Sequence, residues 1–389
     1  MKIGIFAARQ FPYISANTSI AYTVGDELYK LGHSVTYIGM RDSYDQDKTA
    51  SYHNSKICFL NKNVPKQYPV ISRLWNHLRK YISDCLFFKK EISALRHHIR
   101  QESLDVLICI IAPEDNAIIA SYCTDLLPVC LYQLDPFYQR NDQIDMRKYH
   151  LFLDIQHKFH HIFTTDLLYQ EYCSDPYISQ QLTRYSVLHF PKISAENRIN
   201  TAPGKSPSQI SLLYSGTFYH DIRPIDPLLD LKKILPSEVR IIFCGQCDLS
   251  TDQQKLIDSG ILCRGYLSQE ALREQLKEAS ILINIGNKVK NQLGSKLIDY
   301  ISFGKPILNI SLIPNCPTQA ILKNYRYSCS INASDIQAHK QSIMQFITEC
   351  NGKTEDFSII CRKYEQYTSS FVTSEIIHVL GKYIENKED

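Results

Sequence analysis

One segment, residues 281–308, constrains this chain most, because it joins an apolar strand to a polar loop and a short helix. The all-apolar run at Ile281–Ile283 predicts a buried strand, and the polar loop that follows contains a glycine. A helix is predicted to begin at Gly294 and Ser295 and to end before Pro306. The free N–H groups and the positive dipole end at the start of a helix favour anions. The segment therefore predicts a phosphate-binding site above the strand.

Two charged side chains, Lys296 and Asp299, lie near the start of the predicted helix. Asp299 follows Ser295 by about one helical turn, so its carboxylate stays close to the helix start. A carboxylate there can accept hydrogen bonds from vicinal hydroxyl groups such as those of a ribose, while Lys296 or the helix amides bind phosphates. A nucleoside diphosphate meets both requirements.

The composition is that of a globular protein with more than one domain. At 389 residues the chain is long enough for about two to three domains. Hydrophobic residues make up 44% of the chain and aromatic residues 11%, which is enough for a sizeable core in each domain. The formal net charge of +3 is small and is spread along the chain, so we expect no nucleic-acid partner.

The N-terminal sequence and the cysteines both indicate a cytosolic protein. The first residues carry no long apolar segment followed by small residues, and no run approaches the ~18 apolar residues of a membrane-spanning helix. The 13 cysteines are scattered singly and do not form the spaced framework of a secreted disulfide protein. We therefore expect reduced thiols in a cytoplasmic protein.

Apolar segments alternate with helix-length segments through the first half of the chain. The first forty residues combine a strand at Lys2–Ala7, a helix at Thr18–Leu31 and a strand at Ser34–Gly39. Further strands are predicted at Lys56–Leu60, Val106–Ile111, Val129–Tyr132, His161–Thr165 and Ser186–Phe190. This alternation predicts a parallel, doubly wound α/β sheet.

A second alternating set follows a polar segment. Residues 192–208 are rich in proline, serine, asparagine and glycine, which predicts a linker. The later strands are predicted at Ile210–Tyr214, Val239–Cys244, Ile261–Arg264, Ile281–Ile285 and Pro306–Ile310. We expect Rossmann-like domains at 1–191 and 209–356, and a C-terminal helix at 357–389 that packs across the domain junction. Two such domains are expected to face a cleft between the carboxyl ends of their strands.

Four stretches, in order along the chain, resemble GT-B fold nucleotide-sugar glycosyltransferases of the group-1, family 4-like, retaining type. Tyr214–Pro224 is similar to the family's strand and turn with a glycine and a basic residue, and Ile241–Gly245 to its strand that ends in glycine. Cys263–Tyr266 is similar to its short strand with a glycine and an aromatic residue. Asn291–Pro306 is similar to its E-x7-E region, with the spacing kept and both glutamates replaced.

The resemblance implies which residues bind the nucleotide sugar. Asp299, in place of one family glutamate, would hold the ribose, and Arg223 and Lys296 would neutralise the departing diphosphate. The residues assigned to nucleotide binding are Gly216, Thr217, Arg223, Gly245, Tyr266, Asn291, Gly294, Ser295, Lys296, Leu297 and Asp299. The residues assigned to catalysis are Glu114, Arg223 and Lys296.

The resemblance also implies an activity. It implies a hexosyltransferase-like enzyme that moves a sugar from a nucleoside-diphosphate sugar to a saccharide or lipid-linked acceptor, with retention of configuration and without a cofactor or metal ion. The pathway that it implies is cell-surface polysaccharide biosynthesis. Two alternatives stay open: a catalytically silent partner subunit of this fold that binds protein or glycan, and a nucleotide-sugar epimerase.

Glu114 follows the predicted strand at Val106–Ile111 and has two interpretations. The resemblance places a histidine or an acid near the reacting sugar at this point of the chain. Alternatively, Glu114 and Asp115 cap the helix predicted at Asn116–Leu126, because acids are favoured in or before the first turn. The sequence favours neither interpretation.

Residues 73–100 form a predicted amphipathic helix with a basic face. Apolar residues recur at alternating spacings of four and three from Leu74 to Ile99, and seven Lys or Arg against Asp84 and Glu91 give a net charge of +5. Such a helix can lie on an anionic membrane surface, which would place the protein at the inner face of the plasma membrane beside a lipid-linked acceptor. Alternatively, its apolar side packs on the N-terminal sheet and its charges are solvated.

Two further patterns imitate known motifs. Cys244 and Cys247 have C-x-x-C spacing but no second pair, so we expect neither a redox site nor a zinc site. Asp45 and Asp47 have the spacing of a metal-binding D-x-D motif, but they lie in a polar loop far from the predicted nucleotide site. We therefore expect no metal there.

Overall fold

The computed structural model describes residues 1–7, 16–41, 51–52, 55–61, 84–111, 114–140, 143–199 and 209–385. The chain divides into two compact units, Met1–Pro191 with Ser369–Asp389, and Lys192–Thr368. Three predicted features lie wholly or partly outside the described residues: the pair Asp45 and Asp47, residues 73–83 of the basic helix, and residues 200–208 of the linker. No helix among the described residues is long and apolar enough to cross a membrane.

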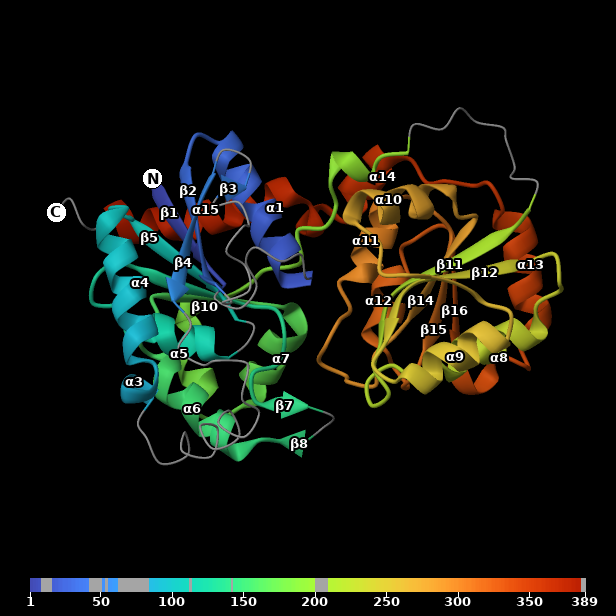
Figure 1. Cartoon of the computed structure of the whole chain (residues 1–389), viewed down its shortest axis with the longest axis horizontal. Helices are drawn as coiled ribbons and strands as arrows, with labels where there is room; N and C mark the ends of the chain where they lie inside the picture. Colours follow the sequence, from blue (N-terminus) through green and yellow to red (C-terminus); the bar gives the residue numbers. More distant parts are fainter. Residues whose placement is uncertain are drawn as a thin grey trace. The chain divides into compact units, whose positions relative to one another are not determined.

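The first unit is a doubly wound α/β domain (Figure 1). Its elements are β1 (Lys2–Phe6), α1 (Ala16–Lys30), β2 (Ser34–Arg41), β3 (Ser51–Tyr52), β4 (Ser55–Asn61), α3 (Asp84–Phe87), α4 (Lys89–Gln101), β5 (Val106–Ile110), α5 (Asp115–Ser121), β6 (Val129–Gln133), β7 (Gln139–Arg140), β8 (Gln143–Ile144), α6 (Met146–Gln156), β9 (His161–Thr164), α7 (Asp166–Ser174), η1 (Ile178–Arg184), β10 (Tyr185–Val187) and α15 (Ser369–Glu385).

The main sheet of this unit has the strand order β10-β9-β6-β5-β1-β2-β4-β3 among the described residues. All neighbouring strands pair in parallel except β3, which pairs antiparallel with β4. Every residue of β5 is buried, as expected for a parallel strand covered on both faces. The predicted parallel, doubly wound sheet is confirmed.

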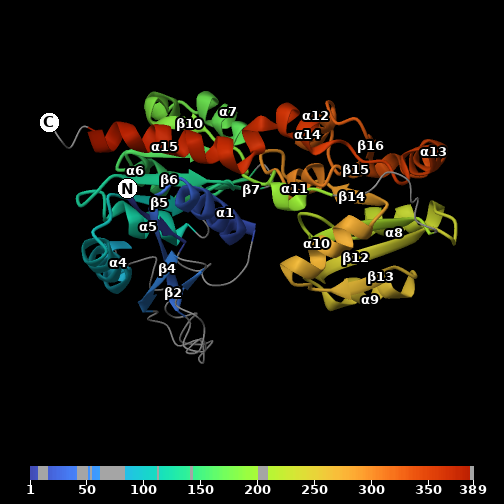
Figure 2. The same ribbon diagram turned by 90° about the horizontal axis from the view of Figure 1, so that it is seen from above.

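Helices cover both faces of this sheet. Apolar side chains of α4, α5, α6 and α7 share one core cluster with Ile38 of β2 and Leu107 of β5. Successive side chains of a strand point to opposite faces, and Tyr37, the neighbour of Ile38, packs against Tyr22 of α1 with ring centroids 5.0 Å apart. α1 therefore lies on the other face, where α15, the last helix of the chain, packs beside it (Figures 1 and 2).

The described part of the predicted basic helix, residues 84–100, is divided into two helices. The chain forms α3 and α4, with a turn at Phe88 between them. Ile92, Leu95 and Ile99 of α4 are buried in the core cluster of this unit. For these residues the apolar side packs on the sheet, as one of the two alternatives predicted.

The second unit is also an α/β domain (Figure 1). Its elements are η2 (Ala195–Asn197), β11 (Ser211–Phe218), α8 (Asp226–Ile234), β12 (Arg240–Cys247), α9 (Ser250–Asp258), β13 (Leu262–Gly265), α10 (Gln269–Glu278), β14 (Ile281–Ile285), α11 (Lys296–Ser302), β15 (Ile307–Ser311), α12 (Pro317–Leu322), β16 (Ser328–Asn332), η3 (Ala333–Asp335), α13 (Lys340–Cys350), α14 (Phe357–Lys363) and η4 (Glu365–Tyr367).

The sheet of the second unit is wholly parallel, with the order β13-β12-β11-β14-β15-β16 in the described residues. Apolar side chains of α8, α9 and α13 share a core cluster with Tyr214 of β11. The next residue, Ser215, is hydrogen-bonded to Tyr300 of α11, so α11 lies on the opposite face. The second predicted Rossmann-like sheet is therefore also confirmed.

The second unit begins and ends at other residues than the sequence predicted. The part of the predicted linker that the structure describes packs on this unit: the N–H groups of Lys192 and Ile193 both donate to Tyr367 O at 3.0 Å, and Asn197 Nδ2 donates to Ser302 Oγ at 3.2 Å. Residues 357–385, expected as one helix, form α14, η4 and α15. The first two belong to the second unit and α15 belongs to the first.

Candidate functional site

Two glycines bring the ends of β11 and β12 close together. Gly216 and Gly245 are paired in register between these parallel strands. A Cβ atom built on Gly245 would lie 1.8 Å from the carbonyl oxygen of Gly216, so no other residue fits there without moving the backbone. The carboxyl ends of parallel strands are where α/β sheets bind ligands, and both glycines were predicted for the site.

Arg223 is held beside Gly216 by a tight turn. Its N–H donates to Tyr219 O at 2.7 Å, and the N–H of Tyr219 donates to Arg223 O at 3.1 Å. The loop between β14 and α11 is tied to the same turn, because the N–H of Lys288 donates to Ile222 O at 2.9 Å. The backbone therefore fixes Arg223 relative to both the strand ends and the loop.

The guanidinium of Arg223 is bonded only to neutral groups among the described residues. Nη1 donates to Tyr214 Oη at 3.2 Å, Nη2 donates to Asn287 Oδ1, and Nε is buried without a partner. Burial raises the pKa of the Tyr214 phenol, which therefore stays neutral at pH 7. A Cβ atom built on Gly216 would lie 3.6 Å from Arg223 Nη1, and one built on Gly294 would lie 3.2 Å from Arg223 Nη2. A half-buried positive charge thus lies beside the backbones of Gly216 and Gly294, and no acid in the described part of the chain pairs with it.

A second charged pair lies at the start of α11. Lys296 Nζ is 3.8 Å from Asp299 Oδ2, and the side chains are 38% and 19% exposed. Gly294, which lies against Arg223, precedes Lys296 by two residues, so both cations border the same short stretch of chain. The carboxylate of Asp299 is the acid that the sequence predicted to hold a ribose.

Tyr300 connects α11 to β11 through hydrogen bonds. Its hydroxyl accepts from the N–H of Ser215 at 2.8 Å and donates to Ser215 O at 3.2 Å. Both side chains are buried, so water does not compete for these bonds. This contact positions the residues at the start of α11 relative to the two glycines.

The predicted binding of phosphate by the amides of α11 stays a prediction, and three of the amides near the helix start already have partners. The helix has only seven residues, and its first N–H groups are already used within a tight turn. The N–H of Leu297 donates to Gly294 O at 3.2 Å, and those of Ile298 and Asp299 donate to Ser295 O at 3.2 and 3.3 Å. Leu297 is also fully buried, so neither its side chain nor its N–H is available to a ligand. Anion binding by Arg223 and Lys296 stays a prediction.

The remaining predicted nucleotide-binding residues border the same strand ends and loop. Thr217 follows Gly216 on β11, and Asn291 and Ser295 lie in the loop before α11; all three are half-buried. Tyr266 directly follows β13, the edge strand of the sheet, and is 71% exposed. An exposed aromatic ring there can stack on a nucleobase, and its role stays a prediction.

Glu114, predicted either to act near the sugar or to cap a helix, lies at the N-cap position of α5 in the first unit. Its carboxylate makes no capping hydrogen bond and instead forms an ion pair with Lys148 of α6. Glu114 thus precedes the first turn of α5 and Asp115 lies in that turn, as the helix-end interpretation predicted, but Glu114 forms no capping hydrogen bond with its side chain. Its catalytic role stays a prediction.

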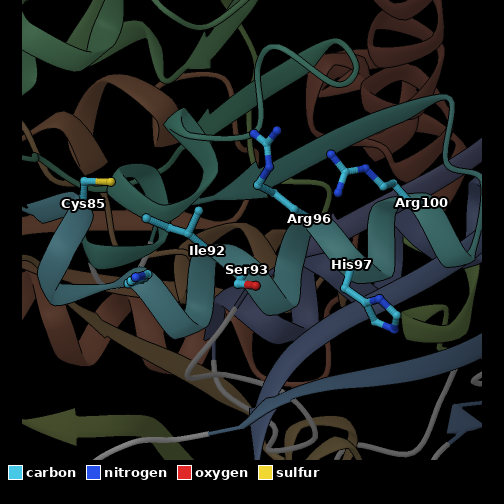
Figure 3. A pocket seen from close by; sticks show the side chains of 7 residues that line it. Cys85, Ile92, Ser93, Arg96, His97 and Arg100 are labelled. Atoms are coloured by element: carbon cyan, nitrogen blue, oxygen red, sulfur yellow. The ribbon is translucent and has the colours of Figure 1, made fainter.

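The basic face of α4 borders a groove of about 360 Å³ (Figure 3). Figure 3 shows Arg96 and Arg100 on one side of the helix and His97 on the other. Arg96 is already neutralised, since it forms two hydrogen bonds to Asp125 at 2.6 and 2.8 Å. Membrane contact through residues 73–100 stays a prediction. Because Arg96 is paired with Asp125, one positive charge fewer than the sequence suggested is available to an anionic membrane.

The C-x-x-C pair shows no sign of activation. Burial raises the pKa of Cys244 to about 11 and that of Cys247 to about 12, whereas a reactive thiol needs a lowered pKa. No group of three or more His, Cys, Asp or Glu side chains suited to a metal ion occurs in the described ranges.

Four side chains that shape the site were not predicted as site residues. Tyr214 and Asn287 hold Arg223, Tyr300 holds α11, and Lys192 lies 4.0 Å from Asp299 Oδ1. Tyr214 and Tyr300 carry a polar group within otherwise apolar segments, which was the available signal. Lys192 carried no sequence signal of a site role, because it lies in the segment that was predicted to be a linker.

No protein-family model matches this chain, and no curated protein matches it in sequence. Among solved structures, a sucrose-phosphate synthase from Thermosynechococcus elongatus superposes with a TM-score of 0.72 at 11% identity, covering 98% of both chains. HepE from Anabaena, in complex with UDP and glucose, gives a TM-score of 0.65 at 11% identity, covering 98% of this chain and 99% of that one. TarM gives a TM-score of 0.69 at 10% identity, covering 97% of this chain and 98% of that one. The chain has the GT-B fold. Within this GT-B fold, the site described above lies on the second Rossmann-like unit.

Proposed function

We propose that this GT-B chain is a glycosyltransferase whose second unit binds a nucleoside-diphosphate sugar. The observation that carries the proposal is the half-buried guanidinium of Arg223, which lies beside Gly216 and Gly294 and has no carboxylate partner in the described chain. A desolvated charge of this kind is costly unless an opposite charge joins it. A diphosphate supplies that charge.

The reaction follows from the charges at this site. As the bond between the sugar and the diphosphate breaks, negative charge grows on the leaving phosphate. Arg223 and Lys296 are positioned to stabilise that charge, and the carboxylate of Asp299 accepts hydrogen bonds from the ribose. The GT-B proteins with similar structures include one in complex with UDP and glucose, which supports a sugar nucleotide as donor.

The finer assignments extend the same proposal. The acceptor is a saccharide or a lipid-linked saccharide, transfer retains configuration without a metal ion, and the pathway is cell-surface polysaccharide biosynthesis. Glu114 is the acid of the first unit proposed to act near the reacting sugar. A cytoplasmic location, with residues 73–100 in contact with the inner face of the plasma membrane, would bring the enzyme to a lipid-linked acceptor.

Release of nucleotide from donor sugars tests the proposal. The purified protein is incubated with UDP-, GDP-, dTDP- and ADP-sugars, with and without a saccharide acceptor, and the released nucleotide is quantified. We expect turnover with one donor base. Tight binding without release or transfer would instead favour a silent partner subunit, and interconversion of sugar nucleotides without an acceptor would favour an epimerase.

Substitution of Lys296 links that turnover to the site. We expect Lys296→Ala to lower the turnover at least about ten-fold, or about 1.4 kcal/mol, because one of the two cations at the diphosphate is lost. Lys323, an exposed lysine at the end of α12, provides the control, and Lys323→Ala is expected to leave turnover unchanged. Full activity in Lys296→Ala would remove Lys296 from the site.

A further inference from the structure

Lys192 is a buried lysine at the start of the second unit. Its side chain is 8% exposed, and Nζ lies 4.0 Å from Asp299 Oδ1. Its position is fixed by the backbone, because its N–H and that of Ile193 both donate to Tyr367 O at 3.0 Å and Ile193 forms a parallel bridge with Thr368. These bonds fix the backbone of Lys192, from which its side chain reaches Asp299.

Asp299 lies between two ammonium groups. Lys192 approaches Oδ1, while Lys296 lies 3.8 Å from Oδ2 and is the more exposed of the two lysines, at 38% against 8%. Both distances exceed that of a hydrogen bond, and no described residue donates a hydrogen bond to either carboxylate oxygen. The carboxylate thus has an ammonium group near each oxygen, while both oxygens keep the capacity to accept hydrogen bonds from a ligand.

The burial of Lys192 acts on its charged form. Burial lowers the pKa of Lys192, and the nearby charge of Asp299 acts in the opposite direction. A lowered pKa means that the folded protein holds the charged form less well than the unfolded chain does. A buried ammonium that faces a carboxylate in a predicted ligand site is typical of a functional arrangement.

We propose that Lys192 is a positioning residue of the donor site, which holds the Asp299 carboxylate oriented to accept hydrogen bonds from the vicinal hydroxyls of a ribose. This inference rests on the proposed function. Its consequence is selectivity for ribonucleotides over 2′-deoxyribonucleotides. A site built to bind a hydroxyl group rejects an analogue that lacks it, because the binding group is then left desolvated without a partner.

Calorimetric titration of the full chain tests this role. The probes are the nucleoside diphosphate that binds most tightly among UDP, GDP and ADP, and its 2′-deoxy form. We expect the wild type to prefer the ribonucleotide. We expect Lys192→Met and Lys192→Gln to weaken ribonucleotide binding about ten-fold while changing the affinity for the deoxy form less than about two-fold, and Lys192→Arg to restore most of the preference.

Two controls separate positioning from a structural role. Lys305 is another buried lysine of this unit and donates to the carbonyl oxygen of Ala279 at 2.9 Å, so Lys305→Met removes a comparable buried charge and is expected to leave the preference unchanged. In an Asp299→Asn background, Lys192→Met is expected to change nothing further. The readout is the ratio of two affinities, which a general loss of stability would not move.

Three outcomes would overturn the inference. The neutral variants could keep the full preference for the ribonucleotide. The neutral variants could instead lose affinity for the ribonucleotide and for its 2′-deoxy form equally and have a lower melting temperature, which would show that the role of Lys192 is structural. The wild type could bind both forms equally. If the wild type binds no nucleotide at all, the proposed function falls as well, so the two failures can be told apart.

Discussion

At the scale of single residues, the site depends on how closely two backbones approach each other. Gly245 of β12 faces the carbonyl oxygen of Gly216, and a Cβ there would lie 1.8 Å from that oxygen. We expect Gly245→Ala to lower the free energy of unfolding by about 2–4 kcal/mol and to weaken nucleotide binding, because the strand ends must separate. Chemical unfolding and calorimetry measure the two effects.

The matched control is Gly381 of α15, where an added Cβ meets nothing within 4 Å. Gly381→Ala is expected to stabilise the protein by about 0.5–1 kcal/mol, because alanine favours the helix and restricts the unfolded chain. Equal stability changes in the two variants would show that the close approach at Gly245 does not exist.

The residues of the site could be predicted from sequence only where a motif or a charge marked them. Arg223, Lys296 and Asp299 follow predicted strands and carry charge, and the structure places them at the strand ends. The groups that hold them, such as Tyr300 and Lys192, come from other parts of the chain. Their roles depend on tertiary contacts that no local pattern encodes.

At the scale of secondary-structure elements, the position of α11 depends on one buried hydroxyl. We expect Tyr300→Phe to cost about 1–3 kcal/mol of stability, because the N–H of Ser215 is left buried and unpaired, and to weaken nucleotide binding, because α11 carries Lys296 and Asp299. Chemical unfolding and nucleotide titration of the same samples test both parts.

Tyr325 provides the comparison, since its buried hydroxyl donates to the carbonyl oxygen of Lys305 at 2.7 Å, before the amino end of β15. Tyr325→Phe is expected to cost similar stability and to leave nucleotide affinity unchanged. If Tyr300→Phe also leaves the affinity unchanged, α11 is not held in place by this contact.

The strands could be predicted well and the short elements could not. Strands buried on both faces appear as apolar runs, which is why β1, β5, β14 and β15 were found near their true positions. β3 has two residues, and β16 is mostly polar and lies at the sheet edge, so neither has such a run. The short α11 was placed correctly, but its tight first turn, which uses its amide groups, had no sequence signal.

At the scale of the whole molecule, the two units differ in how the chain builds them. The second unit is one continuous stretch of chain, Lys192–Thr368, and it has its own hydrophobic core. Every contact described around Arg223 lies within this unit. The first unit needs the chain to return at Ser369 so that α15 packs beside α1. A polar composition suggested that 192–208 was a linker, but Lys192 and Ile193 pair with Tyr367 and belong to the second unit.

This difference predicts that the second unit can stand alone. We expect a fragment spanning Lys192–Thr368 to unfold cooperatively in urea and to bind the same nucleoside diphosphate as the full chain, because the described binding groups all lie within it. Circular dichroism and calorimetry measure both properties. A fragment that folds but binds no nucleotide, while the full chain does, would place essential binding groups in the first unit.

The most direct test of the nucleotide site is the affinity of the full chain for its nucleoside diphosphate when Arg223 is replaced. We expect Arg223→Ala to weaken binding about 10- to 100-fold, or about 1.5–3 kcal/mol, because a charge-assisted contact with phosphate is lost. Arg240, an exposed arginine at the opposite end of β12, is the control, and Arg240→Ala is expected to bind as the wild type does. Unchanged affinity in a folded Arg223→Ala variant would contradict the assignment of this site.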